Sequence, residues 1–409
     1  MIRNFLSLLM LAACTSVASA ENWPEFRGPT ADGKTTADPP IKFSEKENVV
    51  WKTPVDGKAW SSPVVWGDQV WVTNAFADGH KLFAVCLDAE SGKQVKELLL
   101  FEVEKPQFCI DYNSYASPTP AIEEGRIYCS FGAHGTACVD TKTFEVLWTR
   151  QDLECDHFRG PASSPILDGD KLITIFDGAD VQYVVALDKN NGKTLWKHDR
   201  DIDYPKGDNE DWKKAYGTPA IITHAGRRQM ICPSAGSTES LDPETGKRFW
   251  IADHHGMNAA ARPVYGHGLV FITNGHGAMI AIPPEGTGDI TDKIAWDSKR
   301  QVPKKPSLML TDGMLFMLKD DGVFTCVEPE TGEIIYSQRF KGDFDASPLL
   351  AGDRIYLFSK TGKVPVVKVG RKFELLAENQ LDDGFMASPA VYKDSLILRT
   401  RSAVYRIGK

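Results

Sequence analysis

The sequence lacks the motifs that most often carry chemistry. It has no adjacent cysteines, no C-x-x-C pair, no Cys/His spacing typical of zinc, no Walker loop, no dinucleotide fingerprint and no G-x-S-x-G turn. Zinc binding, nucleotide binding and nucleophile-elbow hydrolysis are therefore unsupported. We assign no catalytic residue and no metal ligand from the sequence.

The chain also has little positive charge and only one apolar run of note. It carries 47 Lys and Arg against 55 Asp and Glu, a net charge of −8. This balance argues against nucleic acid or an anionic lipid surface as the main partner. Beyond residue 20 no segment is long and apolar enough to cross a membrane.

Residues 1–20 are predicted to be a signal peptide. A single cation, Arg3, precedes an apolar run over residues 5–13, and residues 18–20 read Ala-Ser-Ala, a typical cleavage site. We therefore expect an extracytoplasmic protein, periplasmic or secreted. In a rival interpretation, residues 11–14 form a lipobox, and Cys14 carries the lipid of an outer-membrane lipoprotein.

Seven cysteines follow the predicted signal peptide: Cys86, Cys109, Cys129, Cys138, Cys155, Cys232 and Cys326. Several occupy positions where related segments have alanine or serine, which is typical of small core residues. Cys129 and Cys138 would lie opposite each other in a hairpin centred between Ala133 and His134. A disulfide between these two is left open.

Two phrases recur along the chain. The first reads "ALDKNNGKTLW" at 186–196, "SLDPETGKRFW" at 240–250 and "CVDTKTFEVLW" at 138–148. The second begins with a small residue and proline, as in "SSPILDGDKLITI" at 163–175. Its prolines are Pro63, Pro118, Pro165, Pro219, Pro263, Pro348 and Pro389, with Leu308 in an eighth slot. Eight copies at a period of 40 to 55 residues indicate a repeat architecture.

Each copy predicts four strands, A to D. A short apolar run follows the proline, an alternating strand follows a Gly-Asp turn, and the Asp-x-x-x-Gly turn joins the last two strands. Four-stranded units of this period predict an all-β, eight-bladed β-propeller of antiparallel blades. The last copy ends after three strands, while residues 48–55 have the strand-D pattern. The N-terminal strand is thus expected to complete the eighth blade and close the ring. The domains expected are the signal peptide (1–20), an N-terminal extension (21–46) and the propeller (47–409).

The recurrent phrase has a structural interpretation. Its aspartate can accept hydrogen bonds from turn N–H groups, its glycine can adopt positive φ, and its tryptophan can cover the neighbouring blade. The residues assigned this role are Asp88, Asp140, Trp148, Asp188, Gly192, Trp196, Asp242, Gly246, Trp250 and Trp51.

These phrases resemble the pyrroloquinoline-quinone (PQQ) repeat of eight-bladed propellers over about residues 47–409. The start "NWPEFRGP" at 22–29 resembles that of a group of secreted bacterial PQQ-like propellers. The chain is also similar to the propeller lipoprotein of the outer-membrane barrel-assembly machinery and, more distantly, to quinoprotein alcohol dehydrogenases. The resemblance to the dehydrogenases implies PQQ and calcium in the funnel, but the adjacent cysteines that pack on the quinone are missing here.

Function is expected on the face where B–C turns and D–A connections emerge, because loops on a rigid scaffold carry most binding sites. The longest connections span residues 102–113 and 197–215. The binding-face candidates are His134, Asp156, His157, Arg159, Asp177, Asp180, Arg262 and His276. The first hypothesis is a non-catalytic, monomeric protein that binds a protein or polymer without a cofactor. The alternative is a PQQ-dependent alcohol dehydrogenase with a reduced funnel.

Overall fold

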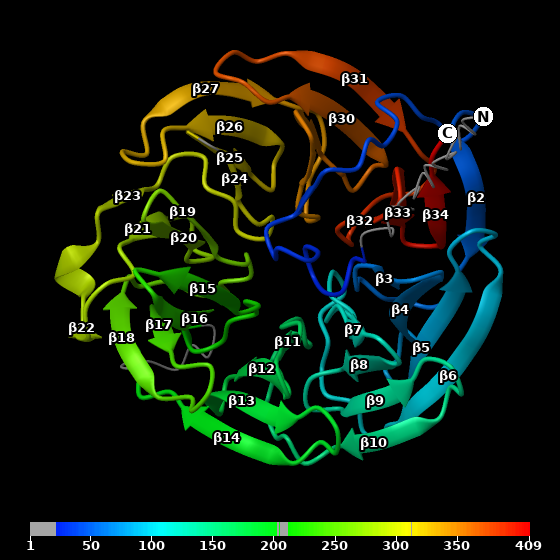
Figure 1. The fold of residues 1–409 in the computed structure, drawn as a ribbon, viewed down its shortest axis with the longest axis horizontal. Coiled ribbons are helices and arrows are strands. Elements are labelled where there is room, and N and C mark those ends of the chain that lie inside the picture. The colour runs from blue at the N-terminus through cyan, green and yellow to red at the C-terminus, as the bar shows by residue number, and fades with distance from the viewer. Residues whose placement is uncertain (1–21, 203, 205–211, 312) are drawn as a thin grey trace, which may run out of the picture.

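The computed structural model describes residues 22–202, 204, 212–311 and 313–409 and forms an eight-bladed β-propeller (Figure 1). Each blade is an antiparallel sheet whose strand A lies at the axis and whose strand D lies at the rim. Blade 1 comprises β3 (Val64–Trp66), β4 (Gln69–Ala75), β5 (Lys81–Asp88) and β6 (Gln94–Glu102), and blade 2 comprises β7 (Ala121–Glu123), β8 (Arg126–Ser130), β9 (Thr136–Asp140) and β10 (Val146–Arg150). Blade 3 comprises β11 (Ile166–Asp168), β12 (Lys171–Asp177), β13 (Gln182–Asp188) and β14 (Thr194–Asp199), and blade 4 comprises β15 (Ala220–His224), β16 (Arg227–Pro233), β17 (Ser237–Leu241) and β18 (Arg248–Asp253).

Blades 5 to 7 continue in the same order. Blade 5 comprises β19 (Val264–Gly266), β20 (Leu269–Thr273), β21 (Met279–Ile282) and β23 (Trp296–Ser298). Blade 6 comprises β24 (Met309–Thr311), β25 (Met314–Leu318), β26 (Val323–Val327) and β27 (Ile334–Arg339), and blade 7 comprises β28 (Leu349–Ala351), β29 (Arg354–Tyr356), β30 (Lys363–Lys368) and β31 (Leu375–Gln380). A one-turn 3-10 helix, η2 (Thr291–Lys293), precedes β23. Strands B and C are buried on both sides by neighbouring blades, as in β12, whereas strand D of the same blade, β14, is mostly exposed.

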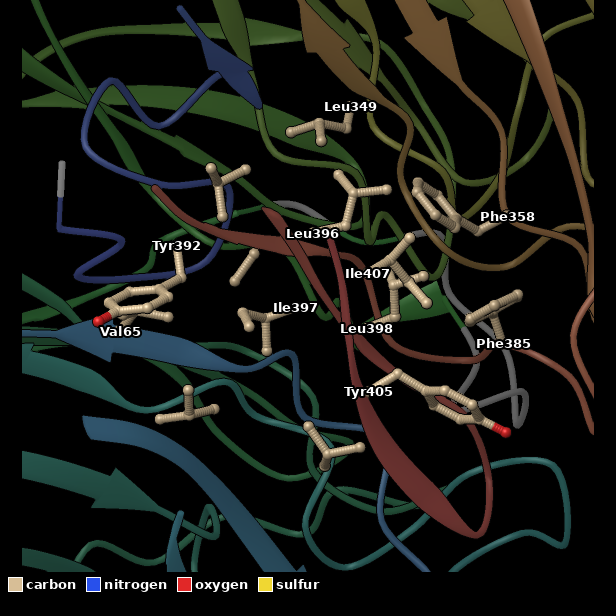
Figure 2. Close-up of a cluster of buried hydrophobic side chains, with 14 of the residues drawn as sticks. Val65, Leu349, Phe358, Phe385, Tyr392, Leu396, Ile397, Leu398, Tyr405 and Ile407 are labelled. Carbon is tan, nitrogen blue, oxygen red and sulfur yellow. The ribbon is translucent and has the colours of Figure 1, made fainter. Parts of the chain in front are cut away.

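The predicted ring closure is confirmed. Blade 8 takes β32 (Ala390–Tyr392), β33 (Ser395–Arg399) and β34 (Ala403–Ile407) from the C-terminus, and β2 (Val49–Pro54) pairs antiparallel with β34 as its fourth strand. In Figure 1 the blue strand β2 lies beside the red strand β34. Figure 2 shows the core beneath, where Leu349 and Phe358 of blade 7, Ile397 of blade 8 and Val65 of blade 1 gather in one apolar cluster. This burial gives the closing blade the same support as the other seven.

A contact between a tryptophan and a glycine recurs at four of the joints between blades. The Trp148 indole N–H donates to Lys189 O at 2.9 Å, and a Cβ on Gly192 would lie 2.7 Å from the Trp148 ring. Gly192 has φ +74°, and Asp188 Oδ1 accepts the Asn190 N–H at 2.8 Å in the same turn. The aspartate therefore shapes a turn whose glycine leaves a flat seat for the preceding tryptophan.

The same seat recurs at three other joints. Trp51 lies on Gly92, Trp196 on Gly246 and Trp296 on Gly332, and each indole donates to a carbonyl of that turn at 3.0 to 3.2 Å. The turn aspartates Asp88, Asp140 and Asp242 accept N–H groups of their own turns at 2.7 to 2.9 Å.

Trp250 departs from the pattern because blade 5 lacks the turn that would receive it. Its indole donates to Gln229 Oε1 at 2.9 Å within its own blade. A longer connection in blade 5 forms β22 (Gly288–Asp289), which pairs in parallel with β18 and places Gly288 opposite Trp250. Strand β22 thus covers the outer edge of β18, which has no turn of blade 5 packed against it.

A ring of hydrogen bonds circles the axis. The hydroxyl before strand A of one blade accepts a backbone N–H from the preceding blade at 2.9 to 3.2 Å. The acceptors are Thr119, Ser164, Thr218, Ser307, Ser347, Ser388 and Ser62. In blade 2 the equivalent residues are Thr119 and Pro120, because strand A begins at Ala121. The repeat assignment on Pro118 was therefore wrong by two residues.

The N-terminal extension runs through the centre of the ring, as the dark-blue segment in Figure 1 shows. Trp23 exchanges backbone hydrogen bonds with Val65 of blade 1, and Pro24 O accepts the N–H of Ile122 in blade 2. Strand β1 (Lys34–Thr35) then pairs in parallel with β28 of blade 7. Residues 22–35, which include the "NWPEFRGP" stretch, are called the plug below.

The predicted hairpin register at Cys129 was wrong. Cys129 pairs with Ala137 and Cys138 with Tyr128, because the connection between β8 and β9 spans Phe131 to Gly135. The two thiols therefore belong to different apolar clusters on opposite faces of the sheet. Both are free, as are the other cysteines from Cys86 onward. Cys14 and the predicted signal peptide lie outside the described residues.

Candidate functional site: the axial cavity

A cavity of about 380 Å³ lies on the propeller axis, on the face where the D–A connections meet. Every one of the eight connections contributes to its wall. The contributing residues, in chain order, are Trp60, Tyr112, Asn113, Arg159, Tyr216, Met257, Asn258, Lys304, Lys305, Asp345 and Met386. The plug supplies Phe26, and the ring of hydroxyls supplies Ser62, Thr119, Ser164, Thr218, Ser347 and Ser388. The cavity is thus built from all the blades and from the N-terminal extension.

One side of the wall is aromatic and held in place. The Trp60 indole N–H donates to Tyr112 O at 3.1 Å, and the Tyr112 hydroxyl accepts from Arg159 Nη1 at 3.0 Å. Lys305 Nζ lies 5.7 Å from the centre of the Tyr112 ring. These contacts orient two flat apolar surfaces beside two cations.

Among the described residues, the lining has more cations than anions. Arg159, Lys304 and Lys305 line the cavity together with one described carboxylate, Asp345. Lys305 Nζ is 2.6 Å from Asp345 Oδ1, and Lys360 Nζ is 3.5 Å from the other oxygen of the same carboxylate. Burial lowers the pKa of Lys305, but Asp345 outweighs that effect and the pKa is raised, so Lys305 remains charged. The described part of the wall therefore carries three cationic side chains, one of which is paired with Asp345.

The hydroxyl ring presents donors. Each of the six lining hydroxyls already accepts a backbone N–H, and none of them donates its proton in a hydrogen bond between described residues. Their O–H groups therefore remain for water or a ligand.

Two of the eight sequence candidates line the cavity: Arg159 and His276. His276 is exposed on the turn between β20 and β21, and its ring lies 6.0 Å from that of Trp212. The other six have partners within the fold.

His134 and His157 are buried, with 6 % of each residue exposed. His134 Nε2 accepts the Gln107 N–H at 3.1 Å, and His157 Nε2 accepts the Ala133 N–H at 2.9 Å. Burial lowers the pKa of both imidazoles, that of His157 to about 3. Both are neutral acceptors that hold the loops of blade 2 and do not reach the cavity.

Asp156 and Asp180 are exposed and join two loops of the same face. Asp180 Oδ1 accepts the N–H groups of Asp156 at 2.7 Å and Val181 at 2.8 Å, while Asp156 Oδ1 accepts the Phe158 N–H at 2.8 Å. Their carboxylates shape the connection that carries Arg159.

Asp177 belongs to a buried ion network between blades 3 and 4. Arg200 Nε is 2.9 Å from Asp177 Oδ1 and Arg200 Nη1 is 2.7 Å from Glu239 Oε2, with all three side chains fully buried. Burial raises the pKa of the Asp177 carboxyl to about 7, although Arg200 opposes this shift. Asp177 is far better placed to hold two blades together than to bind an external cation.

Arg262 replaces the ring hydroxyl in blade 5 and fixes the plug. Its guanidinium donates to Pro219 O at 3.0 Å and to Glu25 Oε1 at 2.7 Å, and it also donates to Phe26 O. The nearby Arg27 donates to Leu308 O at 2.8 Å. Arg262 thus binds the chain's own N-terminal extension, and that contact holds Phe26 at the base of the cavity.

Sequence reasoning missed most of the cavity. Trp60, Tyr112, Lys304 and Lys305 lie in connections that do not repeat, and Phe26 lies before the first blade. A usable signal was present, because each of these residues lies in the connection that leads to a strand A or in the N-terminal extension.

The fold and this site define the class: an eight-bladed propeller of PQQ-type repeats with an axial cavity. The family model described as outer membrane protein assembly factor BamB matches residues 42–238 and 287–369, and the chain belongs to that family. The match leaves out the plug and residues 239–286, where Arg262 replaces the ring hydroxyl.

Individual relatives agree with this assignment. The chain is 22% identical over 308 residues to the outer membrane protein assembly factor BamB of Shewanella oneidensis, covering 69% of this chain and 72% of that protein. The crystal structure of BamB from Moraxella catarrhalis superposes with a TM-score of 0.58 at 13% identity, covering 88% of this chain and 99% of that one.

Quinone-dependent enzymes share the fold as well. A europium-containing methanol dehydrogenase superposes with a TM-score of 0.69 at 11% identity, covering 94% of this chain and 90% of that one. The quinohemoprotein alcohol dehydrogenase of Comamonas testosteroni gives 0.68 at 12% identity, covering 96% and 82%. Identities this low establish a common architecture only. Among the described residues no helix is long and apolar enough to span a membrane.

Proposed function

We propose that this protein is a non-catalytic binding propeller of the cell envelope, which engages a protein or polymer partner through the face that carries the axial cavity. The observation that carries the proposal is the cavity itself, because all eight D–A connections and the plug converge on it. The assembly-factor name of its relatives supports a role beside other envelope components.

The donor set favours binding over quinone chemistry. Among the lining residues that the structure describes, Asp345 is the one carboxylate and is paired with Lys305 and Lys360, and none of them is a cysteine. Among the described residues no group of three or more His, Cys, Asp or Glu side chains is arranged to hold a metal ion. Calcium takes about six to eight oxygen ligands. The described lining offers the unpaired amide oxygen Asn258 Oδ1 beside the lysine-paired Asp345, a set too small for a calcium-held quinone.

A titration with PQQ and calcium, followed by visible absorption, tests the alternative of an alcohol dehydrogenase. We expect no stoichiometric complex. A tight complex that oxidises an alcohol would replace the binding proposal.

Photo-crosslinking tests the proposed face. A photoreactive amino acid at His276 should form adducts with a partner in envelope extract, because His276 lies exposed at the cavity. The matched control carries the same amino acid at Lys247, an exposed residue in a C–D turn on the opposite face. Equal adducts from both positions, or adducts from Lys247 alone, would show that the cavity face is not the binding face.

A further inference from the structure

The plug shows that the centre of the ring binds extended polypeptide. Trp23 and Val65 exchange backbone hydrogen bonds at 2.8 and 2.9 Å, and the Ile122 N–H donates to Pro24 O at 2.8 Å. Strand β1 adds to β28 in parallel. At each of these places the added segment pairs with strand A, the inner edge strand of its blade. Backbone pairing of this kind therefore operates beside the cavity, whose lining includes Phe26 of the plug.

The described wall of the cavity can pair with both polar groups of a peptide. Its six hydroxyls are engaged only as acceptors of backbone N–H groups, so they can donate to carbonyl oxygens. Asn258 Oδ1 has no hydrogen-bond partner among the described residues and can accept an N–H. Every residue of a peptide except proline brings one carbonyl and one N–H. The wall thus offers partners of both kinds.

Another part of the wall is apolar. Met257 and Met386 line the cavity with Phe26, Trp60 and Tyr112. Methionine adapts its shape to the group that it contacts, and aromatic rings offer flat apolar surfaces. An apolar side chain of a peptide can be buried here, whereas a hydroxyl of a sugar would meet only a weak acceptor in a methionine. This part of the wall favours a peptide over a carbohydrate.

The size of the cavity limits what can enter. Its volume of about 380 Å³ is at the small end of ligand sites. The cavity is open to solvent, since Tyr112 is 48 % exposed and His276 is exposed as well. A folded domain is too large for this space, but a few residues in an extended conformation can enter it.

We propose that the axial cavity binds a short extended peptide segment with an apolar side chain, presented by a terminus or a loop of the partner. This inference rests on the proposed function, because both use the same face, and it names the part of the partner that is recognised. The plug, which shows the mode of binding, lies outside the residues that match the BamB family model. Membership of the family therefore does not imply the site.

Selection from a phage-displayed library of random dodecapeptides on the purified protein tests the inference. We expect the selected peptides to share an aromatic or large aliphatic residue. The strongest of them, made synthetically, should bind in a calorimetric titration. Ala162→Trp should weaken that binding at least about tenfold, because Ala162 lines the cavity and the added indole takes up part of its volume. Lys247→Trp adds the same side chain on the opposite face and should leave the affinity unchanged.

A second variant makes the test independent of the folding of the first. Ala260 lines the cavity from another connection, and both alanines are half-buried, so Ala260→Trp should weaken the peptide as Ala162→Trp does. Three results would overturn the inference: no shared sequence among the selected peptides, a shared sequence without an apolar residue, or unchanged binding in both tryptophan variants of the cavity. Displacement of the peptide by a similar concentration of maltotriose would reassign the cavity to carbohydrate.

The outcome is separable from that of the proposed function. Crosslinks from position 276 without peptide selection would reject only the peptide site. Peptide binding in the cavity without crosslinks to an envelope component would keep the site and reject the proposed role in the envelope.

Discussion

At the scale of the residue, burial decides which polar side chains serve the fold and which face the cavity. His157 and Arg159 are two positions apart, yet the imidazole is buried and accepts the Ala133 N–H, whereas the guanidinium reaches the Tyr112 hydroxyl at the cavity wall. The bond from Ala133 requires an unprotonated Nε2, which leaves the ring proton on Nδ1, 3.7 Å from Cys155 Sγ. Protonation of Nε2 would break that bond inside the core.

His157 should therefore make folding sensitive to acid. Burial, aided by the neighbouring His134, lowers its folded pKa to about 3, while an unfolded histidine titrates near its ordinary value of about 6.5. Below that unfolded pKa only the unfolded chain gains the proton, so stability is present above about pH 6.5 and is lost as the pH falls toward about 3.

In the variant His157→Gln, the amide oxygen can still accept a hydrogen bond, but the side chain no longer takes up a proton in this pH range. Between about pH 7.5 and about pH 5, the parent protein should lose about 2 kcal/mol more unfolding free energy than the variant. Urea unfolding at the two pH values measures the difference. Parallel losses in both proteins would mean that His157 is protonated in the folded state.

At the scale of the element, the joint between blades depends on a tryptophan and the glycine beneath it. The seat needs a positive φ and the absence of a side chain, and Gly192 meets both conditions under Trp148. Trp250, whose neighbouring blade has no such turn, is covered instead by the added strand β22. The outer strand is thus covered by a tryptophan packed on glycine at four joints and by an extra strand in blade 4.

Gly192→Ala should lower stability by about 3 kcal/mol, because the new methyl group meets the Trp148 ring in addition to the strain of left-handed backbone. Gly169→Ala is the matched control, since Gly169 has φ +59° and no atom within 4 Å of the added carbon. That control should cost only about 1 kcal/mol, from backbone strain. Equal shifts in the urea midpoints of the two variants would show that the Trp148 contact contributes nothing.

At the scale of the whole molecule, the N-terminal region does two separate things. Residues 49–54 complete blade 8, and the plug contacts the blades near the axis and supplies Phe26 to the cavity lining. The two segments contact different parts of the ring, so they can be removed separately.

Deletion of residues 22–54 should leave β34 as an open edge and expose the apolar cluster around Ile397. We expect this variant to self-associate, because an unpaired strand edge invites pairing with another chain. Deletion of residues 22–35 alone keeps β2 and should elute as the same species as the intact chain. Size-exclusion chromatography with light scattering compares the two. Identical elution of both truncations would mean that β2 is dispensable for closure.

The sequence by itself determined the number of blades, the order of the strands and the closure by residues 48–55. These features are written in local patterns, such as the Asp188 to Trp196 phrase, whose turn chemistry acts over a few residues. It also indicated the face on which the loops converge. It could not set the register of the Cys129 hairpin, because one residue more or less in a Gly-rich turn moves every side chain to the other face.

Only the tertiary structure decided what the cavity is. Arg262 and Glu25 are 237 positions apart, yet they form the contact that holds the plug. Trp60, Lys304 and Arg159 come from connections that share no phrase, and only the closed ring brings them to one wall. The sequences of these loops do not repeat, so no pattern in the sequence predicts that their side chains lie together. They do so because the closed ring of eight blades places the ends of all the loops around one axis.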